Sequence, residues 1–334
     1  PFKEQAFALL HEDNCLWLHD FRTELPEGLA KETFAQSLAY VREGMQVLWQ
    51  GGIEADVFNR LVTILPCRWR EAHIFRVLSA YLKQASFPLS PIAQAEALTR
   101  NPTIGRSLLE LFQARFDPSV TTDRQERQSS ILKRLEIALD KVQSTADERV
   151  LREFMTLILA VVRTNFYMPT AIAAQRVAFK FDSSALRILP DPKPWREVFV
   201  YSPDVMGLHL RFGEVARGGI RWSDRPEDFR TEVLGLVKSQ QVKNAVIVPV
   251  GAKGAFIVRT VYGDKQEIGI NAYQEFLRGL LDVTDNRHKD KVITPKQVVC
   301  HDQEDSYLVV AADKGTASFS DTANAIAAEY QFWL

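Results

Sequence analysis

The chain has 334 residues, of which 46% are hydrophobic and 25% are charged. This length is about twice a typical domain of roughly 150 residues and the apolar content is ordinary, so about two domains with proper cores are expected and a mainly disordered chain is excluded. Lysine and arginine (41) nearly balance aspartate and glutamate (42). The net charge of -1 excludes a chain-wide field that would attract nucleic acid or anionic membranes.

The first half of the chain has the pattern of helices. From about Glu27 to Tyr167, apolar residues recur at helical spacing, and turn or capping signals such as Gly51-Gly52 separate about seven segments. No fixed repeat period is present, so a helical repeat array is not indicated. We therefore expect an irregular all-helical N-terminal domain over residues 1–180.

The pattern of apolar residues changes after Met168. Short β-rich runs appear and alternate with helical stretches, which predicts an α/β layer domain over residues 181–334. The runs are RVAFKFD, EVFVYS, GLHLRFG, NAVIVPVG, AFIVRTV and YLVVAAD. NAVIVPV is apolar at every position but its first, which is typical of a strand buried on both faces. The predicted fold class is α + α/β.

Cysteine usage and the residues at the chain ends bear on the cellular location and on whether the chain is part of a longer protein. Cys15, Cys67 and Cys300 are widely spaced and form no CxxC pair, so neither a disulfide framework nor a zinc cage is indicated and a cytoplasmic location is expected. The apolar run Met155 to Val162 is far shorter than the ~20 residues of a membrane span. The chain opens on proline and closes on an apolar run, so we expect it to be a piece of a longer protein.

The segment from Arg217 to Arg221, RGGIR, is a candidate anion site. Gly218 and Gly219 can expose backbone N–H groups and adopt positive φ, and they stand between two guanidinium groups. This combination suits a bound carboxylate or phosphate. The alternative interpretation is a hairpin or loop with solvated arginines.

Two lysines, Lys243 and Lys253, stand on either side of the strand expected at 244–250. Fully extended, this run would separate their Cα atoms by about 30 Å, at ~3.3 Å per residue, so a turn at Gly251 would have to fold the chain back. The glycines beside Lys253 would let a ligand approach closely, with the amine at the end of that strand. Alternatively, each lysine is a gatekeeper charge beside an aggregation-prone strand.

Asp313 is the third candidate, because it follows a predicted strand and precedes a predicted helix. A carboxylate at the C-terminal end of a strand in an open α/β sheet faces the crevice where such folds bind ligands. The alternative is an Asx-turn residue that bonds nearby backbone. A metal site is not indicated, since CHDQED contains one histidine and no second histidine accompanies it. No GxGxxG occurs, so the chain offers no cofactor-binding residues.

Taken in order, these three segments resemble the glutamate dehydrogenase superfamily. The sequence of these segments is more similar to the very large NAD-specific bacterial enzymes than to the small hexameric ones. The matching stretches are VARGGIRWSDRPEDFRTEVLGLVKSQQVKNAVIVPVGAKGAF and YLVVAADKGTASFSDTANAIAAEYQFWL. The resemblance is strongest over about 195–334 and weaker in the helical half, and it implies a mixed sheet like that of the family's substrate-binding domain.

The resemblance implies two catalytic residues. Lys253 is similar to the family's catalytic lysine, which activates water and polarises the carbon that becomes the carbonyl. Asp313 is similar to the acid/base aspartate that moves protons to and from the substrate nitrogen.

The resemblance also implies four substrate-binding residues. Lys243 looks like the lysine that holds the α-carboxylate. Arg217 falls where the small enzymes carry a lysine for the distal carboxylate, so a guanidinium would here bind that group, in bidentate fashion. Gly218 and Gly219 would let backbone reach the same substrate.

The implied activity is NAD-dependent oxidative deamination of L-glutamate to 2-oxoglutarate and ammonia, in a homo-oligomeric parent enzyme. NAD would be bound mainly by a domain absent from this chain, so the isolated piece would be inactive. Neither nucleic acid nor a membrane is expected as a partner. The alternative is a non-enzymatic helical interaction or regulatory module whose α/β domain binds a dicarboxylate.

Overall fold

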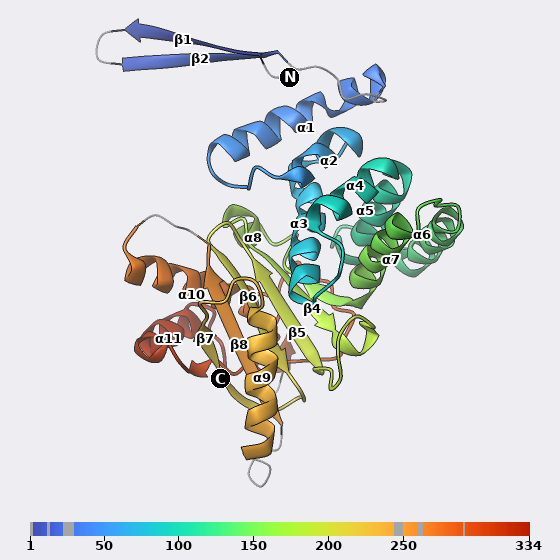
Figure 1. Ribbon diagram of the computed structural model, residues 1–334. Helices are drawn as coiled ribbons and strands as arrows, with labels where there is room; N and C mark the ends of the chain where they lie inside the picture. Colours follow the sequence, from blue (N-terminus) through green and yellow to red (C-terminus); the bar gives the residue numbers. More distant parts are fainter. Residues whose placement is uncertain (1–2, 12–13, 23–29, 244–249, 260–262, 290) are drawn as a thin grey trace.

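The computed structural model describes residues 3–11, 14–22, 30–243, 250–259, 263–289 and 291–334 (Figure 1). Seven α-helices precede the main sheet within these residues, as the apolar spacing predicts. Their bounds are α1 (Lys31–Trp49), α2 (Leu61–Ile64), α3 (Trp69–Gln84), α4 (Pro91–Arg100), α5 (Pro102–Phe116), α6 (Arg124–Leu139) and α7 (Thr145–Ala160). An antiparallel hairpin of β1 (Lys3–His11) and β2 (Asn14–Arg22) lies ahead of them.

The second half is built on one mixed sheet with the strand order β11-β7-β8-β6-β5-β4-β3. The strands are β3 (Val161–Thr164), β4 (Val177–Asp182), β5 (Arg196–Tyr201), β6 (Val205–Arg211), β7 (Arg217–Trp222), β8 (Gly251–Val258) and β11 (Ala311–Ala312). Strands β11, β7 and β8 run parallel, whereas β8, β6, β5, β4 and β3 pair antiparallel. This arrangement confirms the predicted α + α/β fold with a mixed sheet.

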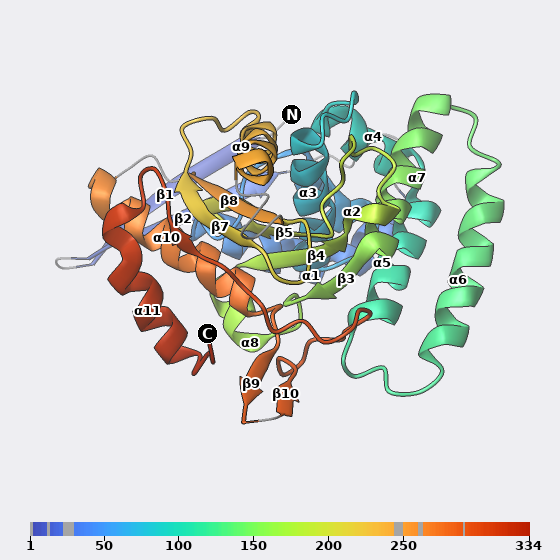
Figure 2. The same cartoon turned by 90° about the horizontal axis from the view of Figure 1, so that it is seen from below.

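Helices cover both faces of this sheet. The remaining elements are α8 (Pro169–Ala173), α9 (Phe229–Lys243), α10 (Lys265–Leu281), α11 (Ser320–Glu329), the small hairpin β9 (Asn286–His288) and β10 (Lys291–Ile293), and the 3₁₀ turns η1 (Val57–Arg60), η2 (Ser183–Ala185) and η3 (Ala317–Phe319). Helices α9 and α3 lie on one face and α10 and α11 on the other (Figure 2). None of the helices in the described ranges is long and apolar enough to cross a membrane.

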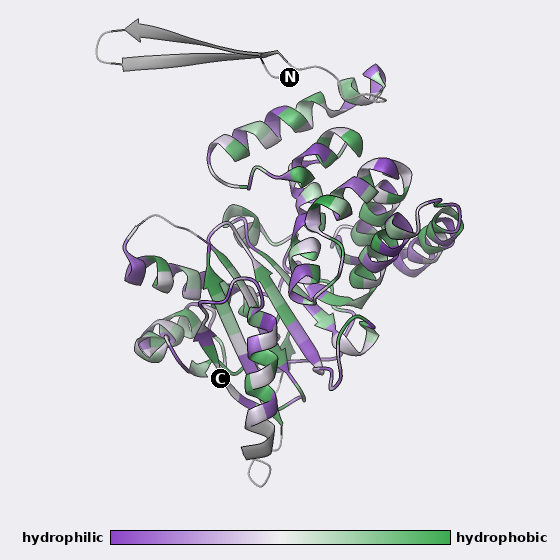
Figure 3. Ribbon diagram, in the orientation of Figure 1, coloured by the Kyte–Doolittle hydropathy of each residue, from purple (hydrophilic) through white to green (hydrophobic). Residues whose placement is uncertain are grey.

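Two apolar cores flank the sheet. One continues from the helical half into the face under α9, where Phe229, Val233 and Val237 pack with Ala255 and Ile257 of β8. The other joins alternate residues of the same strands to α10 and α11. Figure 3 shows the hydrophobic residues gathered along the central strands. Because side chains of a strand alternate between faces, Lys253 lies on the α9 face together with Ala255.

The main sheet begins at Val161, ahead of residue 181, at which we expect the second domain to begin. Helix α7 ends at Ala160 and the chain passes directly into β3, so the expected continuation of this helix to Tyr167 is wrong. Val161 and Val162 are β-branched and favour a strand. Arg163 is buried against Asp285 and Asp302, at 2.6 and 2.5 Å, which are partners no local pattern reveals. The expected buried strand at 244–249 lies outside the described residues.

Candidate active site

Three parallel strands bring two of the predicted residues together. Gly219 of β7 pairs with Lys253 of β8 on one side and with Ala311 of β11 on the other. Asp313 follows β11 directly and therefore stands across β7 from Lys253, although 60 residues separate them in the chain. The sheet register, rather than any local loop, creates this proximity.

Lys253 and Asp313 form a direct ion pair. The Nζ atom of Lys253 donates to Oδ2 of Asp313 at 2.5 Å, and each side chain is 17% exposed. Burial disfavours the charged form of Asp313, but the hydrogen bond from Lys253, the backbone N–H of Lys314 and the charges of Lys253 and Arg221 together lower its pKa below the ordinary value. The carboxylate is therefore ionised at neutral pH.

A tight turn presents Asp313. The N–H of Thr316 donates to the carbonyl of Asp313 at 3.1 Å, and the Thr316 hydroxyl donates to the carbonyl of Ile220 at 2.7 Å, which ties the turn to β7. Gly315 has φ +82°, a conformation that favours glycine. The N–H of Lys314 donates to Oδ1 of Asp313 at 2.7 Å, so the carboxylate bonds nearby backbone as well as Lys253.

We expected Lys253 at the end of a strand. Instead it is the third residue of β8. The GAKGA segment pairs along its length with both neighbours: Lys253 is in register with Leu210 of β6 and Gly219 of β7. Small residues on both sides of the lysine permit this close pairing, and Gly251 opens the strand instead of forming the expected turn. Pairing on both sides fixes the backbone from which the lysine side chain extends.

Gly218 has a packing reason to be glycine. A Cβ atom built on it would lie 1.4 Å from the carbonyl oxygen of Ala252 in β8, a distance no side chain allows. The contact of β7 with β8 thus accounts for this glycine. Gly219 is in register with Lys253, so a side chain there would lie beside the lysine on the same face of the sheet.

Arg217 lies at the start of β7, on the same face as Lys253. Register places its Cα one strand spacing and two residues from that of Lys253, or about 8 Å. Its side chain is exposed and, within the described part of the chain, has no carboxylate partner. Lys243 is the last residue of α9, and its side chain lies outside the described residues.

Two further residues of the site, Glu232 and Ser223, were not anticipated from the sequence. Glu232 accepts from Nη1 of Arg221 at 2.9 Å and from the hydroxyl of Ser223 at 2.6 Å. The second guanidinium nitrogen, Nη2, lies 3.5 Å from Oδ1 of Asp313. The only available signal was the position of Glu232 in the first turn of the helix that follows the arginine segment.

The helical half holds α9 in place. Arg230 forms a buried ion pair with Glu197 of β5 at 2.6 Å, and the hydroxyl of Tyr81 in α3 donates to the same carboxylate at 3.0 Å. Gln84 of α3 accepts from the N–H of Arg230 at 3.2 Å and donates to the carbonyl of Pro226 at 2.9 Å. One side chain of the helical half thus fixes the start of the helix that carries Glu232.

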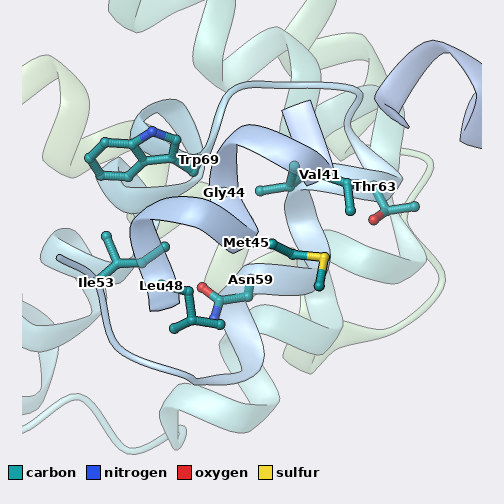
Figure 4. Close-up of a pocket in the computed structure, with 9 residues that line it drawn as sticks. Val41, Gly44, Met45, Leu48, Ile53, Asn59, Thr63 and Trp69 are labelled. Atoms are coloured by element: carbon teal, nitrogen blue, oxygen red, sulfur yellow. The ribbon is translucent and has the colours of Figure 1, made fainter. Parts of the chain in front are cut away.

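A separate hollow of about 90 Å³ lies between α1 and the segment from Ile53 to Trp69 (Figure 4). It is lined mainly by apolar side chains, among them Val41, Met45, Leu48 and Trp69. No charged side chain lines it, so it does not suit a dicarboxylate. The charged cluster at β7, β8 and β11 is therefore the better candidate for chemistry on such a ligand.

Two known protein families match parts of this chain. Residues 134–334, more than half of the chain, match the family described as bacterial NAD-glutamate dehydrogenase, catalytic domain. Residues 53–118 match glutamate dehydrogenase, helical motif 3.

Several similar proteins are named as NAD-specific glutamate dehydrogenases. That of Pseudomonas aeruginosa is 47% identical over 342 residues, 99% of this chain and 21% of the relative. That of Mycobacterium tuberculosis is 42% identical over 99% of this chain and 22% of the relative. That of Neurospora crassa is 28% identical over 54% of this chain and 18% of the relative. The chain thus spans about a fifth of the length of the bacterial relatives it matches.

Proposed function

The chain belongs to the bacterial NAD-glutamate dehydrogenase family, and from this premise we propose that its parent protein oxidatively deaminates L-glutamate to 2-oxoglutarate and ammonia. The activity is a proposal for the whole protein, because the relatives that carry the name are about five times longer than this chain. The observation that carries it is the direct contact of Lys253 with Asp313, at 2.5 Å, across parallel strands.

The chemistry requires groups of these types. Loss of a hydride from glutamate leaves an iminium carbon that water must attack. The attacking water must then lose a proton and the departing nitrogen must gain one, so the site needs an amine beside the carbon and a carboxylate beside the nitrogen to carry these protons. In our proposal Lys253 lies beside the reacting carbon and activates water. Asp313, ionised and hydrogen-bonded to Lys253, accepts the proton and passes it to and from the nitrogen.

The substrate carboxylates would meet cations at the edge of the same sheet face. Arg217 is exposed and lies about 8 Å, between Cα atoms, from Lys253, so we propose that it binds the distal carboxylate. Lys243 would hold the α-carboxylate. We propose that Gly219, in register with Lys253, allows substrate to approach the backbone of β7, and that Gly218 contributes by letting β7 lie close to β8.

NAD supplies the hydride acceptor when bound, and we propose that it binds mainly to a part of the parent protein outside this chain. The described residues contain no glycine-rich turn between a strand and a helix of the kind that holds a dinucleotide pyrophosphate. We assign Lys253, Asp313 and Arg217 to the substrate half of the reaction. The isolated chain is expected to lack glutamate-dependent NAD reduction.

We further propose that the parent enzyme is a homo-oligomer in the cytoplasm, where the free thiols of Cys67 and Cys300 would stay reduced. A non-enzymatic dicarboxylate-binding module is not favoured, because the matching relatives are named as glutamate dehydrogenases.

Calorimetry on the full-length protein tests the substrate class. Glutamate and 2-oxoglutarate should bind. The Arg217→Gln substitution should weaken the affinity for 2-oxoglutarate at least tenfold, because one carboxylate of the ligand loses its cation. Inorganic phosphate is the control anion. Equal binding of phosphate and 2-oxoglutarate, unaffected by the substitution, would contradict the proposal.

A further inference from the structure

Four charged side chains form an unbroken row of alternating sign across the site. Glu232 meets Arg221 at 2.9 Å, Arg221 meets Asp313 at 3.5 Å, and Asp313 meets Lys253 at 2.5 Å. All four are shielded, with side-chain exposures of 13, 19, 17 and 17% in that order. Such shielded contacts are screened by water much less than surface pairs are.

The two arginines of the RGGIR segment are in opposite situations. Arg217 is exposed and has no carboxylate partner among the described residues. Arg221 lies four residues further along the same strand, and each of its terminal nitrogens contacts a protein carboxylate. A guanidinium already held by two carboxylates is poorly placed to take a third from a substrate.

Glu232 is itself held from two sides. Its second oxygen accepts from the hydroxyl of Ser223 at 2.6 Å, and its helix is anchored at the neighbouring residue Arg230 by Gln84. Arg221 therefore has one fixed end at Glu232 and directs its other end at Asp313. This geometry is that of a brace and not that of an open binding group.

We propose that Arg221, held by Glu232, is a positioning residue that aims the Asp313 carboxylate at Lys253 and does not bind a substrate carboxylate. The assignment rests on the proposed function. Arg221 and the N–H of Lys314 both contact Oδ1, leaving Oδ2 for Lys253. Without the guanidinium, Oδ1 keeps only the backbone bond from Lys314, and Oδ2 keeps the bond from Lys253.

The expected effects follow from the value of alignment. Displacement of a reacting group by about 1 Å can lower a rate by about 100-fold. Arg221→Gln should therefore lower kcat by about 10- to 100-fold and leave the KM for glutamate within threefold. Arg221→Lys keeps the charge and should retain at least fivefold more kcat than the glutamine variant. Glu232→Gln keeps the shape but releases the fixed end, so kcat should fall by about 3- to 10-fold at unchanged KM.

The experiment is steady-state kinetics of the full-length protein, with NADH formation measured against glutamate concentration at saturating NAD. Arg217→Gln is the matched control from the same strand, and its KM should rise at least tenfold. Circular dichroism and thermal midpoints establish that each variant is folded. If Arg221→Gln does not fold, the Arg221→Lys variant is compared with wild type: a lowered kcat at constant KM supports the proposal.

Two results would overturn it, and they are distinguishable. A KM for glutamate raised at least tenfold in the Arg221 variants, with kcat near the wild-type value, would make Arg221 a substrate ligand and leave the proposed function intact. A wild-type protein that forms no NADH with glutamate would remove the proposed function and this role for Arg221 together.

Discussion

Replacing Gly218 by alanine tests the contact between β7 and β8 on which the site depends. The added Cβ would lie 1.4 Å from the carbonyl oxygen of Ala252, about 2 Å short of an ordinary contact of 3.4 Å. The obstacle is backbone, so the strands must part, which strains or breaks ladder hydrogen bonds worth about 1 kcal/mol each and adds an overpacking cost of about 1–3 kcal/mol. We expect Gly218→Ala to lower the free energy of unfolding by at least about 3 kcal/mol.

Equilibrium urea unfolding, followed by circular dichroism, measures this loss. The matched control is Gly235→Ala in α9, where a Cβ would meet nothing within 4 Å. Alanine at an exposed helical position should raise the free energy of unfolding by about 0.5–1 kcal/mol. A Gly218→Ala variant as stable as wild type, alongside a control that behaves as expected, would refute the strand register described above.

Three more predictions concern buried groups. Glu197→Gln leaves the buried Arg230 without its counter-charge and should lower the free energy of unfolding by about 3–5 kcal/mol in urea titrations. Burial, with the charge of Glu71 as a lesser contribution, raises the pKa of Cys67 to about 12, so iodoacetamide at pH 8 should label this thiol only after unfolding, as peptide mass spectrometry would show. Burial, assisted by the charge of Arg211, lowers the pKa of His209 to about 4. Between about pH 6.5 and 4 the unfolded state then binds more protons than the folded state, so the free energy of unfolding should fall as pH falls, by up to about 3 kcal/mol. His209→Gln should flatten this dependence of the free energy of unfolding on pH. An unchanged dependence would count against the buried neutral imidazole.

Sequence reasoning succeeded where the pattern is local and repeated. The seven helices follow from apolar residues at helical spacing, and the change to short β-rich runs after Met168 predicted the α/β half. It failed where a partner distant in the chain determines the structure. The local pattern of VVRT predicts a helix, but the segment is a strand in which Arg163 pairs with Asp285 and Asp302, 122 and 139 residues away.

The candidate site shows the same limit. Arg217, Lys253 and Asp313 were selected by residue type and resemblance, and the register of β7, β8 and β11 brings Lys253 and Asp313 into contact. Nothing local indicates that Lys253 is a strand residue or that Glu232 holds Arg221. Both depend on pairing between segments that are distant in the chain.

The most direct test of the central claim is the turnover of the full-length protein with Lys253 replaced by alanine. Glutamate-dependent NADH formation should fall at least 1,000-fold, because the group beside the reacting carbon and the partner of Asp313 are both lost. The matched control is Lys238→Ala, at an exposed position of the neighbouring helix α9, which should retain wild-type turnover. Near-normal turnover of the Lys253→Ala variant would contradict the assignment of this lysine and with it the proposed site.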